Sequence, residues 1–211
     1  GQVDDMVARA TGELGRIDIL VNNAGGAEWG ALAPLPDPPD RPDVGYLAPP
    51  DHAVGMSDET WHRVLNVNLG SVFYCCRAIG PQMMGRGKGK VINIASTAAL
   101  AANPYNIAYH CAKAGVVMFT RVLANEWARY NVNVNAISPG WFITEATKRM
   151  FQSDDRENQA WARVQLDWLP LRRLTDIREL GLLAVYLASP ASDWMTGQNI
   201  ALDGGETNFG H

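Results

Sequence analysis

The 211-residue sequence predicts an α/β domain built on a doubly wound parallel sheet. Three observations predict this fold class. Short apolar runs typical of buried strands recur along the chain, long segments with helical periodicity separate them, and the runs end in glycine or in short polar residues. Strands separated by long helices cannot pair as hairpins. They need crossover connections, which place the strands parallel and the helices on both faces of the sheet.

The first elements follow this pattern. Residues 2–15 carry apolar side chains at helical spacing, and Gly15 ends this helix. Residues 17–21 form a short, mostly apolar run bounded by glycine and asparagine, which is typical of a buried strand. The polar, glycine-containing turn 22–26 follows this strand.

Helices and strands alternate through the rest of the chain. Ser57 or Asp58 can cap a helix that continues over 58–84, and Gly80-Pro81 should kink or interrupt its last turns. The other expected helices span 106–130 and 177–187, and short helices are expected within 142–168. The other expected strands span 91–95, 132–137 and 198–202, and residues 138–140 stop the second of these.

Residues 27–57 differ from the rest of the chain in composition. Seven of the twelve prolines fall within 17 residues of this segment, at positions 34, 36, 38, 39, 42, 49 and 50. Each proline removes a backbone donor and fixes φ, so we expect a stiff irregular insertion, either a solvated surface loop or a functional one. The predicted organisation is one domain over residues 1–211 with this proline-rich insertion.

The composition argues against several classes of protein. Lys and Arg number 18 against 22 Asp and Glu, for a net charge of −4 and a pI near 5.5, whereas nucleic-acid binders are usually basic. No run of 18 apolar residues is present to span a membrane. The three cysteines fit neither a disulfide framework nor a metal site, and no secretory signal begins the sequence. We therefore expect a reduced, cytoplasmic protein without a metal.

Three of the predicted strands end in polar or glycine-bearing segments. These segments are Asn22–Gly25, Ser96 and Pro139–Gly140. In open parallel sheets, ligands bind beyond the carboxyl ends of the strands. We therefore expect the three segments to converge on one rim of the sheet and to form a binding site there.

Tyr109 and Lys113 can supply acid–base chemistry near this rim. They lie four residues apart on a predicted helix, so their side chains share one face. A free tyrosine has a pKa of about 10, and a nearby ammonium favours the phenolate. A tyrosine tuned toward neutrality can act as a general acid or base, and the Ser96 hydroxyl can hold a carbonyl or hydroxyl oxygen beside it. On its own, the pair also fits an ordinary helix surface.

Together with several other segments, this trio resembles the short-chain dehydrogenase/reductase family, in its short single-domain branch. The match covers nearly the whole chain except the insertion and follows the family's order of motifs. The matching segments are Asn22-Asn23-Ala24-Gly25, Asn68 within Val67-Asn68-Leu69, Ser96, Tyr109 with Lys113, Pro139-Gly140 with Thr144, Pro170 to Leu174, and Gly197-Gln198 through Asp203-Gly204-Gly205.

The resemblance implies a Rossmann-like sheet and reversible hydride transfer between NAD or NADP and a small carbonyl or secondary alcohol substrate. Tyr109 would be the general acid/base, and Lys113 would lower its pKa and bind the nicotinamide ribose. Ser96 would orient the substrate oxygen, and Asn68 would help hold a proton-relaying water. The implied cofactor-binding residues are Asn22, Ala24, Gly25, Tyr109, Lys113, Pro139, Gly140, Phe142 and Thr144.

The family also implies a homodimer or homotetramer, for which the helices 58–84 and 106–130 offer wide apolar faces. The substrate itself is open: an oxoacyl thioester, a sugar acid, a steroid or a small ketone is compatible. Residues 97–105, Trp141 and 150–168 are expected to decide it. His110 is interpreted as a packing or surface residue, and Asp203 as part of a structural turn.

The sequence departs from the family where a glycine-rich phosphate-binding turn is expected. That turn, which follows the family's first strand, is absent, and so is the residue that selects NAD or NADP. The resemblance therefore implies that the N-terminal part of the sheet is missing from this chain, which would leave strand 17–21 as an exposed edge. We expect a fragment. Two alternatives stay open: a catalytically incomplete relative that cannot hold the cofactor, and an epimerase or dehydratase that uses the same Tyr/Lys pair.

Overall fold

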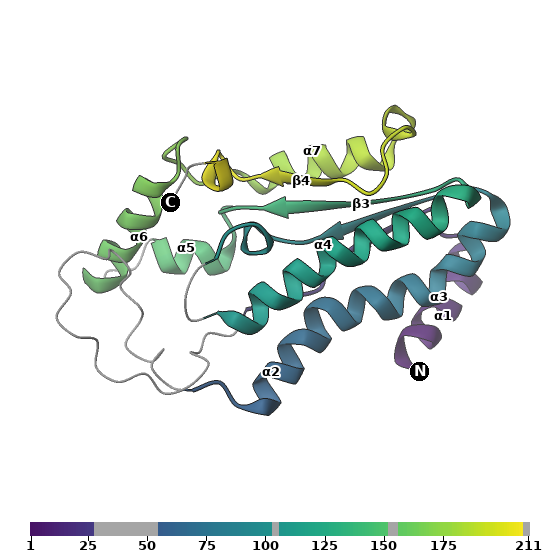
Figure 1. Cartoon of the computed structure of the whole chain (residues 1–211), viewed down its shortest axis with the longest axis horizontal. Helices are drawn as coiled ribbons and strands as arrows, with labels where there is room; N and C mark the ends of the chain where they lie inside the picture. The colour runs from purple at the N-terminus through teal and green to yellow at the C-terminus, as the bar shows by residue number, and fades with distance from the viewer. Residues whose placement is uncertain (28–54, 103–105, 152–155, 209–211) are drawn as a thin grey trace.

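The computed structural model describes residues 1–27, 55–102, 106–151 and 156–208 (Figure 1). Within these residues one sheet of parallel strands runs in the order β1-β2-β3-β4, which confirms the predicted fold class. The strands are β1 (Ile19–Asn22), β2 (Gly89–Ile94), β3 (Val132–Pro139) and β4 (Asn199–Leu202). Because each strand is parallel to its neighbour in the chain, every connection crosses over a face of the sheet.

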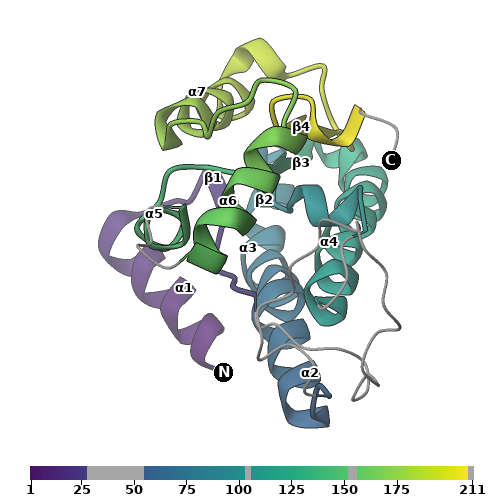
Figure 2. The same cartoon turned by 90° about the vertical axis from the view of Figure 1, so that its left-hand side faces the viewer.

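Helices cover both faces of the sheet, as the two views in Figures 1 and 2 show. One face packs against α1 (Gln2–Leu14), α3 (Ser71–Arg86) and α4 (Ile107–Trp127), and the other against α7 (Ile177–Ala188). The first interface buries a core that includes Met83, Val116 and Val134, and the second is centred on Ile92, Ile137 and Leu187. Two hydrophobic layers therefore enclose the central strands, as a doubly wound sheet requires.

The helix expected over 58–84 differs from the prediction in its interior. Ser57 Oγ accepts the amide of Thr60 at 3.1 Å and caps α2 (Asp58–Leu65), as expected. A π-helical turn, η2 (Asn66–Gly70), then joins α2 to α3. Of the predicted kink or interruption at Gly80-Pro81, the interruption does not occur, because α3 continues through Pro81 to Arg86. Pro81 deprives only the carbonyl of Arg77 of an amide partner, and Arg77 is exposed, so water can replace that hydrogen bond.

The remaining elements agree with the sequence apart from their ends. β3 does not stop before Ser138 but continues through Pro139, which pairs with Leu202 in the sheet. The segment after β3 forms two short helices, as expected: α5 (Glu145–Phe151) and α6 (Arg156–Trp168). The predicted insertion 27–57 lies almost wholly outside the described residues. No helix within the described ranges is long and apolar enough to cross a membrane.

A buried chain of polar side chains ties β1 to β2 and to α4. Asn22 Nδ2 donates to Asn93 Oδ1 at 2.8 Å, and Asn93 Nδ2 donates to Thr120 Oγ1, also at 2.8 Å. The Thr120 hydroxyl donates in turn to the carbonyl of Val116. All three polar side chains are buried, and these bonds meet the requirement that buried amides find partners.

β1 is an edge strand within the described part of the chain. Its ladder pairs with β2, and Ile19 and Val21 remain 45% and 47% exposed. An apolar strand with one unpaired side is prone to pairing with another strand.

Two glycines of α3 predict opposite effects on stability. A Cβ on Gly80 would lie 2.5 Å from ring atoms of the buried Trp127, whereas a Cβ on Gly85 would meet nothing within 4 Å. Gly80→Ala should therefore lower the free energy of unfolding by about 1–3 kcal/mol through overpacking. Gly85→Ala should raise it by up to about 1 kcal/mol through helix propensity. Urea denaturation of both variants measures this. Equal effects of the two substitutions would contradict the packing described for Gly80.

Candidate active site

A cleft of about 510 Å³ opens at the carboxyl ends of the strands. Its walls come from the segment after β1, the ends of β2 and β3, and the first turns of α4, which is the convergence expected for this sheet. Of the predicted site residues, those that line it are Gly25, Ser96, Tyr109, Lys113, Pro139, Gly140, Phe142 and Thr144.

Ser96 and Tyr109 form a hydrogen-bonded pair in this cleft. Ser96 follows β2 directly, and its Oγ also accepts the amide of Ala98 at 3.1 Å, which fixes the residue at the start of a short 3₁₀ turn. Burial raises the pKa of Tyr109, and its hydrogen bond with Ser96 lowers it, with burial the larger effect. The phenol is therefore held in its protonated form, with its oxygen next to a serine hydroxyl.

Lys113 is the buried cation of the site. Its side chain lies one turn after Tyr109 on α4, only 4% of the residue is exposed, and Nζ donates to the carbonyl of Ile94 at 2.8 Å. Burial lowers the pKa of Lys113 to about 8. Nζ lies 5.5 Å from the centre of the Tyr109 ring.

The electrostatics of Tyr109 differ from the sequence-based expectation. We expected Lys113 to lower the pKa of Tyr109, but the net shift is upward. The physical reason is that both side chains lose water in the same enclosed space. Desolvation disfavours the phenolate of Tyr109 and the ammonium of Lys113 alike, and the ammonium is bonded to the carbonyl of Ile94.

Asn68 lies in the π-helical turn η2 and connects it to the segment after β1. Its Nδ2 donates to the carbonyl oxygens of Gly26 and Val64, at 2.8 and 2.9 Å, and its Oδ1 accepts the amide of Gly26 at 3.2 Å. Asn68 is buried and is not among the residues that line the cleft. In this structure the side-chain amide of Asn68 is hydrogen-bonded to the backbone of Gly26 and does not point into the cleft.

Two of the predicted cofactor-binding residues also lie away from the cleft lining. The Asn22 side chain turns into the core, where Nδ2 donates to Asn93 and to the sulfur of Cys76. Ala24 is exposed and does not line the cleft. Sequence reasoning placed them here because both lie in the predicted turn 22–26, whereas Asn22 is the last residue of β1. The pleat of a strand sends alternate side chains to opposite faces of the sheet, and the Asn22 side chain points into the core.

Several residues of the cleft were missed or interpreted differently from the sequence. His110 was interpreted as a packing or surface residue, but it lines the cleft, with Nδ1 2.8 Å from the carbonyl oxygen of Asn106. Trp141, which was expected to help decide the substrate, does line the cleft, with its ring packed edge-on against Phe151 at 5.6 Å between centroids. Asn106 and Glu206 complete the polar lining. The sequence carries no signal for Glu206.

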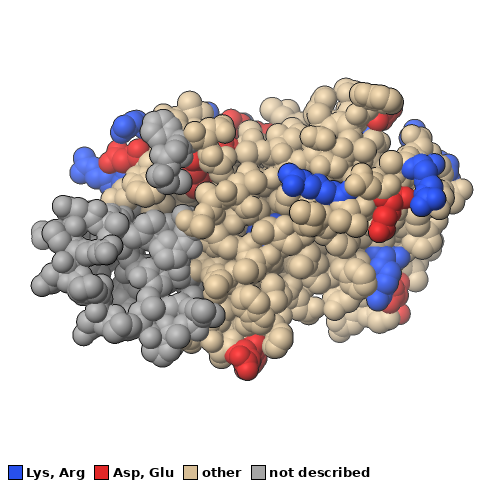
Figure 3. Space-filling model, viewed as in Figure 1, with Lys and Arg blue, Asp and Glu red and all other residues tan. Residues whose placement is uncertain are grey.

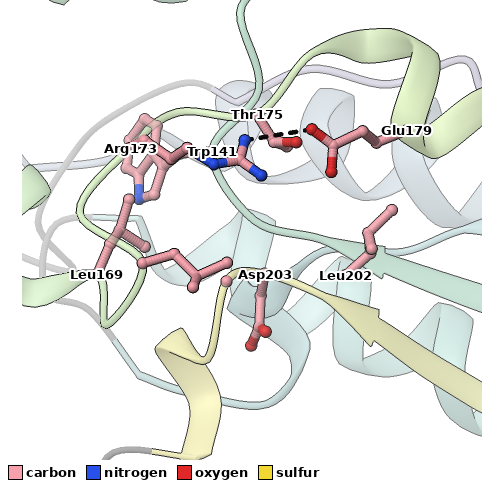
Figure 4. A pocket seen from close by; sticks show the side chains of 9 residues that line it. Trp141, Leu169, Arg173, Thr175, Glu179, Leu202 and Asp203 are labelled. Carbon is pink, nitrogen blue, oxygen red and sulfur yellow. Dashed lines mark hydrogen bonds and ion pairs between the residues drawn. The ribbon is translucent and has the colours of Figure 1, made fainter.

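A second, smaller cavity of about 70 Å³ shares Trp141 with the cleft. Figure 4 shows the Arg173 guanidinium and the Glu179 carboxylate meeting there, with Nη1 and Oε1 3.2 Å apart. Both groups are about half exposed, so the ion pair contributes little to stability. The Asp203 side chain points away from this pair (Figure 4) and accepts the amides of Gly205 and Thr207, both at 2.9 Å. This geometry supports the interpretation of Asp203 as part of a structural turn.

The buried Lys113 predicts a pH dependence of stability. Its pKa is about 8 in the folded chain against 10.5 ordinarily, so between these values the unfolded chain binds more protons. The free energy of unfolding should therefore rise from about pH 8 to 10.5, by a contribution of the order of 3 kcal/mol. Urea denaturation across this range should show the rise in the wild type and its loss in Lys113→Met. Lys88→Met, at an exposed position, should keep it. Parallel curves for the wild type and Lys113→Met would refute the assignment.

Gly25 is closely packed in the site, which predicts that a larger residue there destabilises the fold. A Cβ there would lie 2.5 Å from Asn68 Oδ1 and 3.3 Å from Lys113 Nζ. Asn68 cannot move aside without breaking its bonds to Gly26 and Val64. Gly25→Ala should lower the free energy of unfolding by about 1–3 kcal/mol. Gly26→Ala, whose Cβ would meet nothing within 4 Å, should change it by less than about 0.5 kcal/mol. Calorimetry of the two variants tests this pair, and equal melting temperatures would contradict the close packing.

Comparison with known proteins gives matches across nearly the whole chain. The sequence profile of the family described as Enoyl-(Acyl carrier protein) reductase matches residues 43–207. A 2-dehydro-3-deoxy-D-gluconate 5-dehydrogenase of Dickeya dadantii is 36% identical over 201 residues, which are 95% of this chain and 69% of that protein. A galactitol 2-dehydrogenase (L-tagatose-forming) of Cereibacter sphaeroides is 36% identical over 192 residues, 90% of this chain and 72% of that protein.

Solved structures agree with these matches. The crystal structure of a gluconate 5-dehydrogenase from Burkholderia cenocepacia in complex with NADP and tartrate is 33% identical, with a TM-score of 0.81. The alignment covers 99% of this chain and 72% of that one. From the profile, the sequence relatives and the fold together, the chain belongs to the short-chain dehydrogenase/reductase family of oxidoreductases.

Proposed function

We propose that this chain transfers hydride between a nicotinamide cofactor, NAD or NADP, and a substrate that is a carbonyl in one direction and a secondary alcohol in the other. The observation that carries this proposal is the meeting of Ser96, Tyr109 and Lys113 in one cleft at the carboxyl ends of the strands. A phenol hydrogen-bonded to a serine, with a buried ammonium beside its ring, is an arrangement suited to moving a proton to or from a carbonyl oxygen.

The proton and the hydride balance as follows. In reduction, the substrate carbon receives the hydride, the C=O double bond becomes a single bond, and the oxygen takes the proton of Tyr109. In oxidation, the hydroxyl proton passes to the Tyr109 oxygen as the hydride leaves the carbon. Ser96 holds the substrate oxygen by a hydrogen bond. Burial raises the pKa of Tyr109, so the phenol carries its proton in this structure.

The residues of the cleft fit the nicotinamide end of such a cofactor, which supplies or accepts the hydride when it is bound. Lys113 Nζ has donors beyond the one bonded to Ile94. Pro139, Gly140, Phe142 and Thr144 form the neighbouring wall. The family relative from Burkholderia cenocepacia was solved with NADP, which supports a nicotinamide cofactor but leaves the choice between NAD and NADP open for this chain.

Two other functions compete with the proposed hydride transfer. One is a relative that cannot hold the cofactor, which the binding measurement described below distinguishes. An epimerase or dehydratase is disfavoured, because the relatives reported above carry the names of dehydrogenases.

A homodimer or homotetramer is part of the proposal. A groove of about 740 Å³ between η2 and α4 carries apolar side chains, several of them exposed, among them Phe73, Met118 and Val122. Figure 3 shows that the middle of the face over α3 and α4 carries few charged side chains. Such a face is suited to another copy of the chain.

The Tyr109→Phe variant tests the proposed chemistry. It removes the phenolic hydroxyl and with it the transferable proton, so turnover should fall by at least about a hundredfold, while the chain still folds and still binds NADH or NADPH. Tyr130→Phe, at an exposed position outside the cleft, is the matched control and should keep full activity. Cofactor affinity is measured by nicotinamide fluorescence, and turnover by absorbance with a panel of ketones.

Two results would count against the proposal in different ways. Turnover retained by Tyr109→Phe would remove the assigned role of Tyr109. No binding of either cofactor to the wild type at millimolar concentration would favour the relative that cannot hold it.

A further inference from the structure

The backbone that leaves β3 toward α5 forms one wall of the cleft. Phe142 and Thr144 of this segment line the cleft and are assigned to the cofactor, and Thr144 lies directly before α5. Thr147, the third residue of α5, lines the cleft as well and has no assigned role. The hydrogen bonds of this segment show that it is held at two points.

The first point is a contact with Thr175. Phe142 pairs with Thr175 in an isolated parallel bridge, and the amide of Ile143 donates to the carbonyl of Thr175 at 2.8 Å. The amide of Thr175 donates in turn to the carbonyl of Trp141 at 3.2 Å. Thr175 lies just before α7, which packs against the sheet. The first residues of the wall are therefore anchored to the body of the fold, and Thr144 lies beyond this anchor.

The second point is the hydroxyl group of Thr147. Its Oγ1 accepts the backbone amide of Thr144 at 2.7 Å and donates to the carbonyl of Phe142 at 2.5 Å. Thr144 Oγ1 accepts the amide of Thr147 at 3.1 Å in return, so the two threonines cap the start of α5 reciprocally. A hydroxyl has one hydrogen to donate, and that of Thr147 is donated to the backbone. Thr147 is therefore suited to holding the wall rather than to donating to a ligand.

We propose that Thr147 is a positioning residue: its hydroxyl holds Phe142 and Thr144 where they form the wall assigned to the nicotinamide cofactor. This inference rests on the proposed function and adds a residue to the same site. The groups assigned to the proton transfer, Ser96 and Tyr109, belong to other elements, after β2 and in α4. Loss of the Thr147 hydroxyl should therefore weaken cofactor binding and leave the proton transfer intact.

Two substitutions of Thr147 test this role. Thr147→Val removes the hydroxyl and keeps the branched shape, whereas Thr147→Ser keeps the hydroxyl. For the cofactor that the wild type binds, NADH or NADPH, the Kd from nicotinamide fluorescence should rise about fivefold or more in Thr147→Val. It should stay within about twofold of the wild type in Thr147→Ser. With a ketone that the wild type reduces, the KM of the cofactor should rise by the same factor as the Kd, and kcat should change by less than about twofold. A fall in kcat with an unchanged KM would overturn the inference.

The start of α2 offers a matched control. Ser57 and Thr60 occupy there the same two helix positions as Thr144 and Thr147 in α5, and Ser57 Oγ accepts the amide of Thr60. Neither Ser57 nor Thr60 is among the described residues that line the cleft. Thr60→Val should therefore leave the Kd of the cofactor unchanged. A rise of the same size as in Thr147→Val would show a general effect of a weakened helix start and would overturn the inference.

Amide hydrogen exchange, followed by NMR without cofactor, separates this inference from the proposed function. The amide of Thr144 donates to the Thr147 hydroxyl and should exchange about fivefold faster or more in Thr147→Val. The amide of Ile143, bonded to Thr175, should keep its rate. If the wild type binds neither cofactor, the proposed function fails, and the exchange at Thr144 alone decides whether Thr147 holds the wall. Unchanged exchange at Thr144, an unchanged Kd in Thr147→Val where the wild type binds, or no rescue by Thr147→Ser overturns the inference.

Discussion

The hydrogen bond from the buried ammonium of Lys113 to the carbonyl of Ile94 is the interaction on which the site depends. It joins α4 to the last residue of β2. One residue earlier in β2, Asn93 bonds to Thr120 of the same helix. Two bonds between one strand and one helix fix the helix in both position and rotation. Ser96, two residues beyond Ile94, and Tyr109, one turn before Lys113, are thereby brought within bonding distance.

The burial of Lys113 costs free energy. A lysine with 4% exposure and no carboxylate bonded to it in the described structure is destabilised in its charged form, as its lowered pKa of about 8 records. Gly25 is packed against the same ammonium and against Asn68, which is itself bonded to the turn at Gly26. The π-helical turn carries Asn68 to that position. π-Helical turns of this kind occur frequently at functional sites, because they re-aim one side chain without ending the helix.

The sequence predicted the fold and several residues that line the candidate cleft, for identifiable reasons. Apolar runs and helical periodicity located the strands, and the rule that ligands bind at carboxyl strand ends predicted that Ser96 and Pro139–Gly140 lie together. Three features escaped it. The inward turn of Asn22 depends on its pairing with Asn93, 71 residues away. The direction of the Tyr109 pKa shift depends on how much water the folded cleft excludes. Glu206 enters through packing against Gly140, a long-range contact with no local pattern.

The buried polar chain from Asn22 through Asn93 to Thr120 has a consequence for how the sheet assembles. Shifting β1 against β2 by one residue would turn every side chain of β1 to the opposite face. Apolar contacts alone would disfavour the shifted register only weakly, because Ile19, Leu20 and Val21 are all apolar. An amide left buried without its partner is penalised at once. Asn22 therefore specifies the register of β1 against β2. A single residue at the end of a short strand distinguishes the correct alignment from alignments shifted by one residue during folding.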